Sequence, residues 1–259
     1  MTRLIVFANR KGGCGKTTTA VNVAHALAKK KKKVLLVDTD PQAHATLSLG
    51  YVSHSPSPGI SALLRGEASF REAVTQTHID GISLIASSRD LLCFETEFSA
   101  SEGQGRERLL SDRLTGKADE FDYLIFDPPP TAGLLTRMAL AAAREVYIPM
   151  QMHFLNLEGL AEMVRLIFEV NAASNPHLRL EGVIPTFFNK STRIAKEVTA
   201  DIIRHFGEDK LLPGIRMCIS LTEAPGHGKS ILEYAPGSTG ASDYMALADQ
   251  INGVHHGRR

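Results

Sequence analysis

A glycine-rich segment near the start of the chain carries the residues best suited to bind phosphate. Residues 11–18 read KGGCGKTT and follow an apolar run at residues 4–8. Glycines let a backbone wrap closely around phosphate, and successive N–H groups together with a helix N-terminus supply partial positive charge. In this pattern Lys16 is expected to reach the β- and γ-phosphates of a nucleotide, and the Thr17 hydroxyl is expected to bind Mg²⁺.

Acidic residues follow two other apolar runs. Asp38 comes directly after residues 34–37 and lies two positions before Asp40, and Asp127 follows residues 123–126. The carboxyl ends of parallel strands meet at one edge of an open sheet, where ligands bind. Carboxylates at the same edge as a phosphate-binding loop suit the Mg²⁺ ion of a nucleotide. A structural turn with incidental acids would require three coincidences, so the sequence predicts a nucleoside triphosphate site at this edge.

The elements that must position these residues alternate in type along the chain. We expect strands at residues 4–8, 34–37, 82–86, 123–126, 146–150 and 182–185. Helical patterns lie at residues 17–30, 106–114, 155–172, 192–206 and 242–251. This alternation predicts an α/β fold of the P-loop NTPase type, with a mainly parallel, twisted sheet and helices on both faces.

The loop-like interruptions do not divide the chain into domains. Residues 51–60 and 99–105 are too short to be convincing interdomain linkers. We therefore expect one domain over residues 1–252, followed by a flexible tail at residues 253–259.

Composition indicates a soluble protein with a sizeable core. Of the 259 residues, 43% are apolar, and the formal net charge of +1 restricts any nucleic-acid surface to a local patch. The three cysteines, Cys14, Cys93 and Cys218, form no CxxC pair, which fits a reducing compartment. Residues 1–9 show no signal-peptide pattern, and no apolar stretch approaches the roughly 20 residues of a membrane span. We expect a cytoplasmic protein.

The phosphate-binding segment departs from the strict GxxxxGK[ST] pattern at one position and adds a second lysine. Arg10 replaces the first glycine, and Lys11 precedes the remaining glycines. With VLLVDTDPQAHATLSLG and FDYLIFDPPPTAGLL further along, the segment resembles the deviant-Walker ATPases of the ParA/MinD family. The similarity is greatest to the short, Soj-like ParA branch and extends through LEGLAEMV, GVIPTFFNKSTR and LTEAPGHGKSI.

The resemblance implies a role for the second lysine. In that family two subunits close face to face on two ATP molecules, and the extra lysine reaches the phosphates bound by the partner. A lysine in trans would neutralise phosphate charge that is otherwise buried uncompensated between subunits. The alternative for Lys11 is a solvated loop lysine. The implied cofactors are ATP and Mg²⁺, and the implied assembly is an ATP-dependent homodimer.

The resemblance also assigns roles by matching position. The implied nucleotide-binding residues are Lys11, Gly12, Gly13, Cys14, Gly15, Lys16, Thr17 and Thr18. The implied catalytic residues are Lys11, Lys16 and Asp40, of which Asp40 positions or activates the attacking water. The implied metal site comprises Thr17, Asp38 and Asp127, with the two acids acting mostly through water. Pro128 stands where the family commonly has Cys, Thr or Ser, and hydrolysis without a partner is expected to be slow.

Nonspecific DNA binding is a further implication of the resemblance. It would use basic residues late in the chain and depend steeply on salt. The candidates are Lys190, Arg193, Lys196 and Arg216. Where relatives read IPRNVRLSEAP, this chain reads IRMCISLTEAP, so two family arginines fall on Met217 and Ser220. The run of five lysines at residues 29–33 is either a solvated helix end or an auxiliary surface for DNA or a partner.

Three functions remain open from the sequence. The first is a positioning ATPase that is nucleoid-associated and stimulated by a ParB-like or other cargo-adaptor protein. The second is an ATP-dependent regulatory switch that binds a protein partner without coating DNA. A metabolic ATPase with a small-molecule substrate is a more distant third. A MinD-like membrane role is rejected because INGVHHGRR at the end of the sequence has no apolar face.

Overall fold

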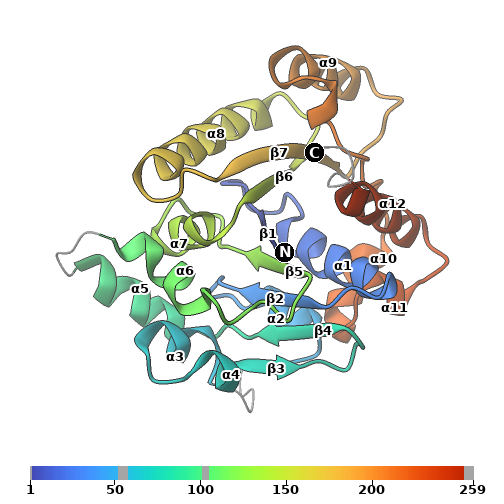
Figure 1. Ribbon diagram of the computed structural model, residues 1–259. Coiled ribbons are helices and arrows are strands. Elements are labelled where there is room, and N and C mark those ends of the chain that lie inside the picture. The colour runs from blue at the N-terminus through green and yellow to red at the C-terminus, as the bar shows by residue number, and fades with distance from the viewer. Residues whose placement is uncertain (1, 52–57, 101–104, 254–259) are drawn as a thin grey trace.

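A computed structural model describes residues 2–51, 58–100 and 105–253 of the chain, with the side chains of residues 99 and 100 left aside. The described residues form one sheet in the strand order β3-β4-β2-β5-β1-β6-β7, with helices on both of its faces (Figure 1). The β3–β4 pair is antiparallel and the other neighbouring pairs are parallel. The predicted fold class is confirmed.

The strands are short and mostly buried. Their bounds are β1 Arg3–Phe7, β2 Val34–Asp38, β3 Val74–Gln76, β4 Ile82–Ile85, β5 Tyr123–Asp127, β6 Glu145–Gln151 and β7 Arg179–Thr186. Each predicted strand corresponds to one of these, with ends that differ by a few residues. The short edge strand β3 was not predicted, because its VTQ sequence carries little apolar character and is only partly buried.

Helices fill the connections. The longer ones are α1 Lys16–Lys29, α5 Asp90–Ala100, α7 Leu134–Ala142, α8 Leu155–Ala173, α9 Arg193–Phe206 and α12 Thr239–Gly253. The shorter ones are α2 His44–Ser48, α3 Gly59–Arg65, α4 Phe70–Ala73, α6 Leu109–Leu114, α10 Ser220–Glu223 and α11 Ile231–Tyr234. Single 3₁₀ turns cover η1 Arg106–Arg108, η2 Glu208–Lys210 and η3 Ala224–His227.

The core consists of two apolar layers, one on each face of the sheet. In β1, Val6 faces the layer covered by helices such as α7 and α8, whereas Ile5 and Phe7 face the layer covered by α1 and α12. Both sets are fully buried, as expected for a central parallel strand. Figure 1 shows the two groups of helices on either side of the sheet.

Some sequence expectations fall at or beyond the limits of the described residues. α12 ends at Gly253, so the remainder of the expected tail lies outside them, as do parts of the two expected loops. The lysine run does begin at a helix end, since α1 ends at Lys29. All three cysteines are free. Within the described residues, no helix has the length and apolar character needed to cross a bilayer.

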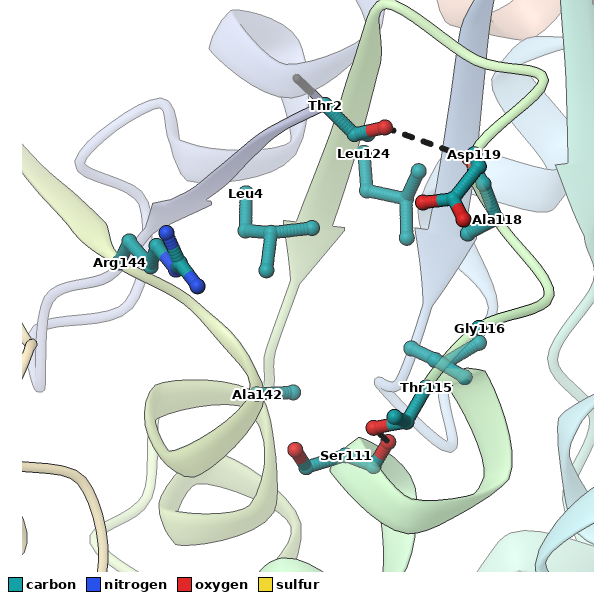
Figure 2. A pocket seen from close by; sticks show the side chains of 11 residues that line it. Thr2, Leu4, Ser111, Thr115, Gly116, Ala118, Asp119, Leu124, Ala142 and Arg144 are labelled. Carbon is teal, nitrogen blue, oxygen red and sulfur yellow. Dashed lines mark hydrogen bonds between the residues drawn. The ribbon is translucent and has the colours of Figure 1, made fainter.

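The edge of the sheet where the parallel strands begin carries a cavity of about 210 Å³. Figure 2 shows its apolar floor around Leu4 and Leu124, with Asp119 and Arg144 on opposite sides. None of the predicted functional residues lines it. The predicted chemistry lies at the other edge, where the parallel strands end.

Candidate nucleotide-binding site

The glycine-rich segment forms a loop between β1 and the first turn of α1. Gly13 and Gly15 have φ values of 69° and 88°, a left-handed conformation that side-chain-bearing residues rarely adopt. Gly15 also lies against Thr186, because a Cβ atom added to it would be 3.4 Å from the Thr186 methyl carbon. Helix α1 then begins at Lys16, and its first N–H groups lack acceptors within the helix. The loop thus has the backbone geometry of an anion site.

Two side chains from neighbouring strands hold the loop in place. At the end of β6, the Gln151 amide donates a hydrogen bond of 3.2 Å to the carbonyl of Gly13. At the end of β7, the Thr186 hydroxyl donates one of 2.9 Å to the carbonyl of Cys14. Because these bonds occupy carbonyl oxygens, they turn the loop carbonyls toward the protein and leave the N–H groups available to a ligand.

An open cavity of about 610 Å³ lies beside the loop. Its walls include Lys16, Thr17 and Asp40, together with residues of α2 and Pro225. This volume lies in the range of small-molecule and cofactor sites. The structure therefore brings together Gly12, Gly13, Gly15, Lys16, Thr17, Thr18 and Asp40, all of which were singled out from the sequence.

The two lysines of the loop differ in position. Lys16 is buried, lines the cavity, and donates a 3.4 Å hydrogen bond from its ammonium to the carbonyl of Lys11. The Lys11 side chain is exposed, and its Nζ donates instead to Oδ1 of Asn156 on α8. The acceptors of both ammonium groups are neutral oxygens. In this conformation only Lys16 faces its own cavity.

Asp38 and Asp127 are neighbours across the sheet. They end β2 and β5 and are register partners in that strand pair. Asp38 accepts three hydrogen bonds: one from the N–H of Asp40 at 3.1 Å, and two from the N–H and hydroxyl of Thr46 at 2.8 and 2.7 Å. Burial raises the pKa of Asp38 to about 7, although these hydrogen bonds favour its charged form. Asp38 thereby fixes the turn that carries Asp40.

Asp127 is fully buried, and neither of its carboxylate oxygens accepts a hydrogen bond of ordinary geometry in the described part of the chain. The Thr17 hydroxyl and the Lys16 ammonium lie close enough to favour its charged form. Burial and the charge of Asp38 raise the pKa of this carboxyl well above its ordinary value. A buried, unpartnered carboxylate beside a phosphate cavity fits a site that is completed by a cation.

The protein donors alone are too few to hold a metal ion. Among the described residues, no group of three or more His, Cys, Asp or Glu side chains could bind one. This fits Mg²⁺, which binds through one or two carboxylates and completes its octahedron with waters and substrate phosphates. Asp127, with the Thr17 hydroxyl at the cavity wall, is the residue best placed for this role.

Asp40 lies on a short turn between β2 and α2. One of its carboxylate oxygens accepts a 2.9 Å hydrogen bond from the N–H of Gln42, and its carbonyl accepts one of 2.7 Å from the Ser87 hydroxyl. The side chain is nearly buried and lines the cavity. Its second carboxylate oxygen has no hydrogen bond to the part of the chain described, so it is available to a water molecule in the cavity.

The residues considered for DNA binding lie apart from the phosphate cavity. Arg193 and Lys196 are exposed in the first turn of α9, and Lys190 is exposed in the turn just before it. Arg193 forms an ion pair of 2.7 Å with Glu197. A short parallel bridge between Phe188 and Arg216 brings the second candidate segment beside the first.

Arg216 is paired with an acid. Its guanidinium binds both carboxylate oxygens of Asp243, the closer at 2.7 Å, and the hydrogen bond raises the pKa of Arg216. Arg216 also lines a cavity of about 50 Å³ with Phe187, adjoining Thr18 of the loop. The two residues that stand where relatives have arginines differ in exposure: Met217 is 73% exposed and Ser220 is half-buried.

Several residues of the site were not predicted. Gln151 and Thr186 end strands at the edge that binds ligands, and that position could have identified them. Asn156 could not have been found in this way, because it contacts Lys11 across a separation of 145 residues. Gln42 and His44 line the cavity within four residues of Asp40, and their closeness to that acid in sequence was the available signal.

Comparison with known proteins gives a consistent family assignment. The AAA domain family matches residues 2–180. The chain is 39% identical over 249 residues to the chromosome-partitioning ATPase Soj of Thermus thermophilus, covering 96% of this chain and 95% of that protein. It is 36% identical over 249 residues to the chromosome partitioning protein ParA of Myxococcus xanthus, covering 96% of this chain and 87% of that protein.

A solved structure also matches in full. The crystal structure of cobyrinic acid a,c-diamide synthase from Mycobacterium smegmatis with bound ATP analogue and magnesium has a TM-score of 0.85 and 31% sequence identity. The match covers 100% of this chain and 98% of that one. Together with the lysine pair of the phosphate loop, these matches confirm the resemblance found in the sequence: the chain belongs to the ParA/MinD family of P-loop ATPases.

Proposed function

We propose that this protein is a ParA-like ATPase that forms an ATP-sandwich homodimer, binds DNA nonspecifically, and positions or segregates a plasmid, chromosome or protein cargo. It hydrolyses ATP with Mg²⁺, as its family membership and the magnesium-bound relative indicate. The names of its Soj and ParA relatives support a role in partition. Stimulation by a ParB-like or other adaptor protein, and a cytoplasmic, nucleoid-associated location, belong to the same proposal.

The residues of the cavity divide the chemistry among themselves. Lys16 and the loop N–H groups would bind phosphate, while Asp127 and Thr17 would hold Mg²⁺, with Asp38 beside them. When bound, this ion neutralises and orients the phosphate oxygens. Asp40 accepts a hydrogen bond from the attacking water through its remaining carboxylate oxygen and orients it. Asp40 is the one carboxylate among the described residues that line the cavity, which supports slow hydrolysis without a partner.

The observation that carries the dimer proposal is the direction of Lys11. Its ammonium contacts a neutral amide on α8 outside its own phosphate cavity, whereas Lys16 alone of the two lines that cavity. A cation on the rim of the site is available to a triphosphate presented by a second copy. The dimer then forms only when ATP is bound, because the phosphates of the ATP on one copy pair with the Lys11 ammonium of the other.

Light scattering with and without ATP and Mg²⁺ tests this proposal. The wild-type mass should double with ATP, and the Lys11→Ala variant should bind ATP as a monomer without doubling. Asp40→Ala should accumulate the dimer, because binding is retained while hydrolysis falls by roughly 10²–10⁴-fold. A wild-type protein that stays monomeric at saturating ATP while hydrolysing at full rate would contradict the sandwich.

The regulatory switch without DNA is the second candidate. It is favoured by the carboxylate partners of Arg193 and Arg216 and by the exposed Met217 and Ile219, since these weaken a basic surface. A salt titration of DNA binding separates the two functions. ATP-dependent binding with a steep salt dependence supports the positioning ATPase, and its absence at low salt supports the switch.

The third candidate follows from the structural relative described as a synthase. An amide synthase activates a carboxylate with ATP, so its hydrolysis depends on a small-molecule acid. The two higher-identity relatives carry partition names instead. Steady hydrolysis of ATP by the purified protein, stimulated by DNA and an adaptor and unchanged by added cobyrinic acid, would exclude this candidate.

A further inference from the structure

His44 lies on the wall of the phosphate cavity, although no part of the proposed mechanism uses it. It is the first residue of α2 and lines the cavity together with Lys16 and Asp40. Its side chain is exposed, and its imidazole makes no hydrogen bond or ion pair to the part of the chain that the structure describes. An imidazole always carries at least one N–H donor, in either tautomer and in the charged form. It is therefore a free donor in an anion-binding cavity.

The turn fixes the backbone position from which this side chain extends. Ala43, just before it, has a φ of 55°, a left-handed conformation that is unfavourable for a residue with a Cβ atom. The turn is fixed on both sides, since the N–H of Ala43 donates to the Asp40 carbonyl at 2.8 Å and Thr46 is bound to Asp38. His44 and Asp40 therefore sit on one rigid turn, so that only the side-chain torsions of His44 must become ordered when it contacts a ligand.

The position of His44 on that turn indicates which phosphate of a bound nucleotide it would contact. The glycine loop and the start of α1 form one wall of the cavity, and Asp40, Gln42 and His44 contribute to another. If Asp40 orients the water that attacks the last phosphorus atom, the group beside it lies near the last phosphate. A contact there is made with a triphosphate and is lost with a diphosphate.

We propose that His44 donates a hydrogen bond to the terminal phosphate of bound ATP and so helps the site to distinguish ATP from ADP. This inference rests on the proposed phosphate site and on the assignment of Asp40, but not on dimerisation or DNA binding. A hydrogen bond to a charged oxygen of this kind contributes about tenfold to affinity.

Two substitutions of similar size test the contact. His44→Leu removes the donor, whereas His44→Gln keeps an N–H donor at a similar distance from the backbone. Dissociation constants are measured with Mg²⁺ for a non-hydrolysable ATP analogue and for ADP. His44→Leu should weaken the analogue about tenfold and ADP less than twofold, and His44→Gln should recover most of the loss.

Controls separate this inference from the rest of the proposed function. His177→Leu removes another exposed histidine, at the opposite edge of the sheet, and should leave both affinities unchanged. The measurements are repeated in a Lys11→Ala background. If the ATP-sandwich dimer exists, this background keeps the protein monomeric. If it does not exist, the effect of the His44 substitutions on the two affinities is the same in both backgrounds. Equal losses for the analogue and ADP, or no loss for either, would overturn the role of His44.

Discussion

The two lysines of the phosphate loop and the two arginines of the late basic segments differ in the groups that they contact. Lys11 and Lys16 donate to neutral oxygens, from Asn156 and from the backbone. Arg193 and Arg216 each bind a carboxylate within 2.7 Å. The first pair keeps its charge available to a ligand, whereas the second pair is already compensated within the chain.

The acids of the two regions differ in the same way. Asp127 is buried and accepts no hydrogen bond of ordinary geometry in the described part of the chain, while Asp243 is held on both oxygens by Arg216. A site whose lysines and buried acid form no ion pair of their own is prepared for a ligand that brings charges of both signs, as Mg²⁺-ATP does. A surface whose charges are paired internally binds a polyanion only after those pairs exchange partners.

The largest expected effect is at Lys16. Lys16→Ala should weaken ATP binding by roughly 10²–10³-fold, because it leaves phosphate charge unpaired in a largely buried site. Lys190→Ala removes an equal charge from the late basic segment and should leave ATP affinity unchanged. Equilibrium binding of a fluorescent ATP analogue measures both. Comparable losses in the two variants would show that net charge, rather than position, determines nucleotide affinity.

The next effect concerns the unpartnered acid. Burial and Asp38 raise the pKa of Asp127, so the folded metal-free protein retains a proton that the unfolded chain has released. By linkage, this group makes the metal-free protein less stable as pH rises above the unfolded pKa. Asp127→Asn removes the penalty, so it should raise the unfolding midpoint at pH 7 by about 2–4 °C for each kcal/mol recovered.

Calorimetry in chelator at pH 7 and near pH 4 measures this gain, which should shrink at the lower pH, because near pH 4 the carboxyl of the unfolded chain is itself partly protonated. Asp243→Asn is the matched control, since that acid has a partner, and it should not raise the midpoint. Loss of stability in Asp127→Asn at pH 7 would mean that Asp127 is compensated after all.

The sequence predicts the strands of the sheet better than the helices that cover it. The six predicted strands were recognisable because runs such as VLLV are apolar on both faces of the pleat. Helix α7 was missed because LLTRMALAA is short and apolar on nearly all sides, and α5 because the consecutive apolar residues Leu91, Leu92 and Cys93 obscure its helical period. These two helices cover the core. The short helix α2 was also missed, and it lines the phosphate cavity.

Within the site, residues adjacent along the chain were predictable and contacts between distant segments were not. Lys16, Thr17 and Asp40 follow from local patterns at strand ends, because those patterns directly encode a loop and an edge. The Arg193–Glu197 pair is also readable, since residues four apart share a helix face. The Arg216–Asp243 pair joins two elements 27 residues apart, and only the folded chain brings them together.

A smaller effect is expected from releasing Lys11. Asn156→Ala removes the amide that accepts from the Lys11 ammonium and should lower the ATP concentration needed for dimerisation about threefold to tenfold. Asn156→Asp should shift it in the opposite direction, because a carboxylate holds the ammonium more strongly. Light scattering across an ATP titration measures both variants. A shift in the same direction for both would indicate a structural effect at the start of α8.

The smallest effect is expected for DNA affinity when an arginine is released from its ion pair. This change tests directly whether internal pairing limits the late basic segments. Glu197→Gln frees Arg193, whose side chain is 92% exposed, and should raise DNA affinity about twofold to fivefold, since surface ion pairs contribute at most about 1 kcal/mol. The salt dependence of binding should also steepen by about one unit for the freed cation.

Glu120→Gln changes net charge equally at the opposite edge of the sheet, away from α9. An equal gain in that control would mean that overall charge governs binding, and the internal pairing of the late basic segments would then have no bearing on DNA.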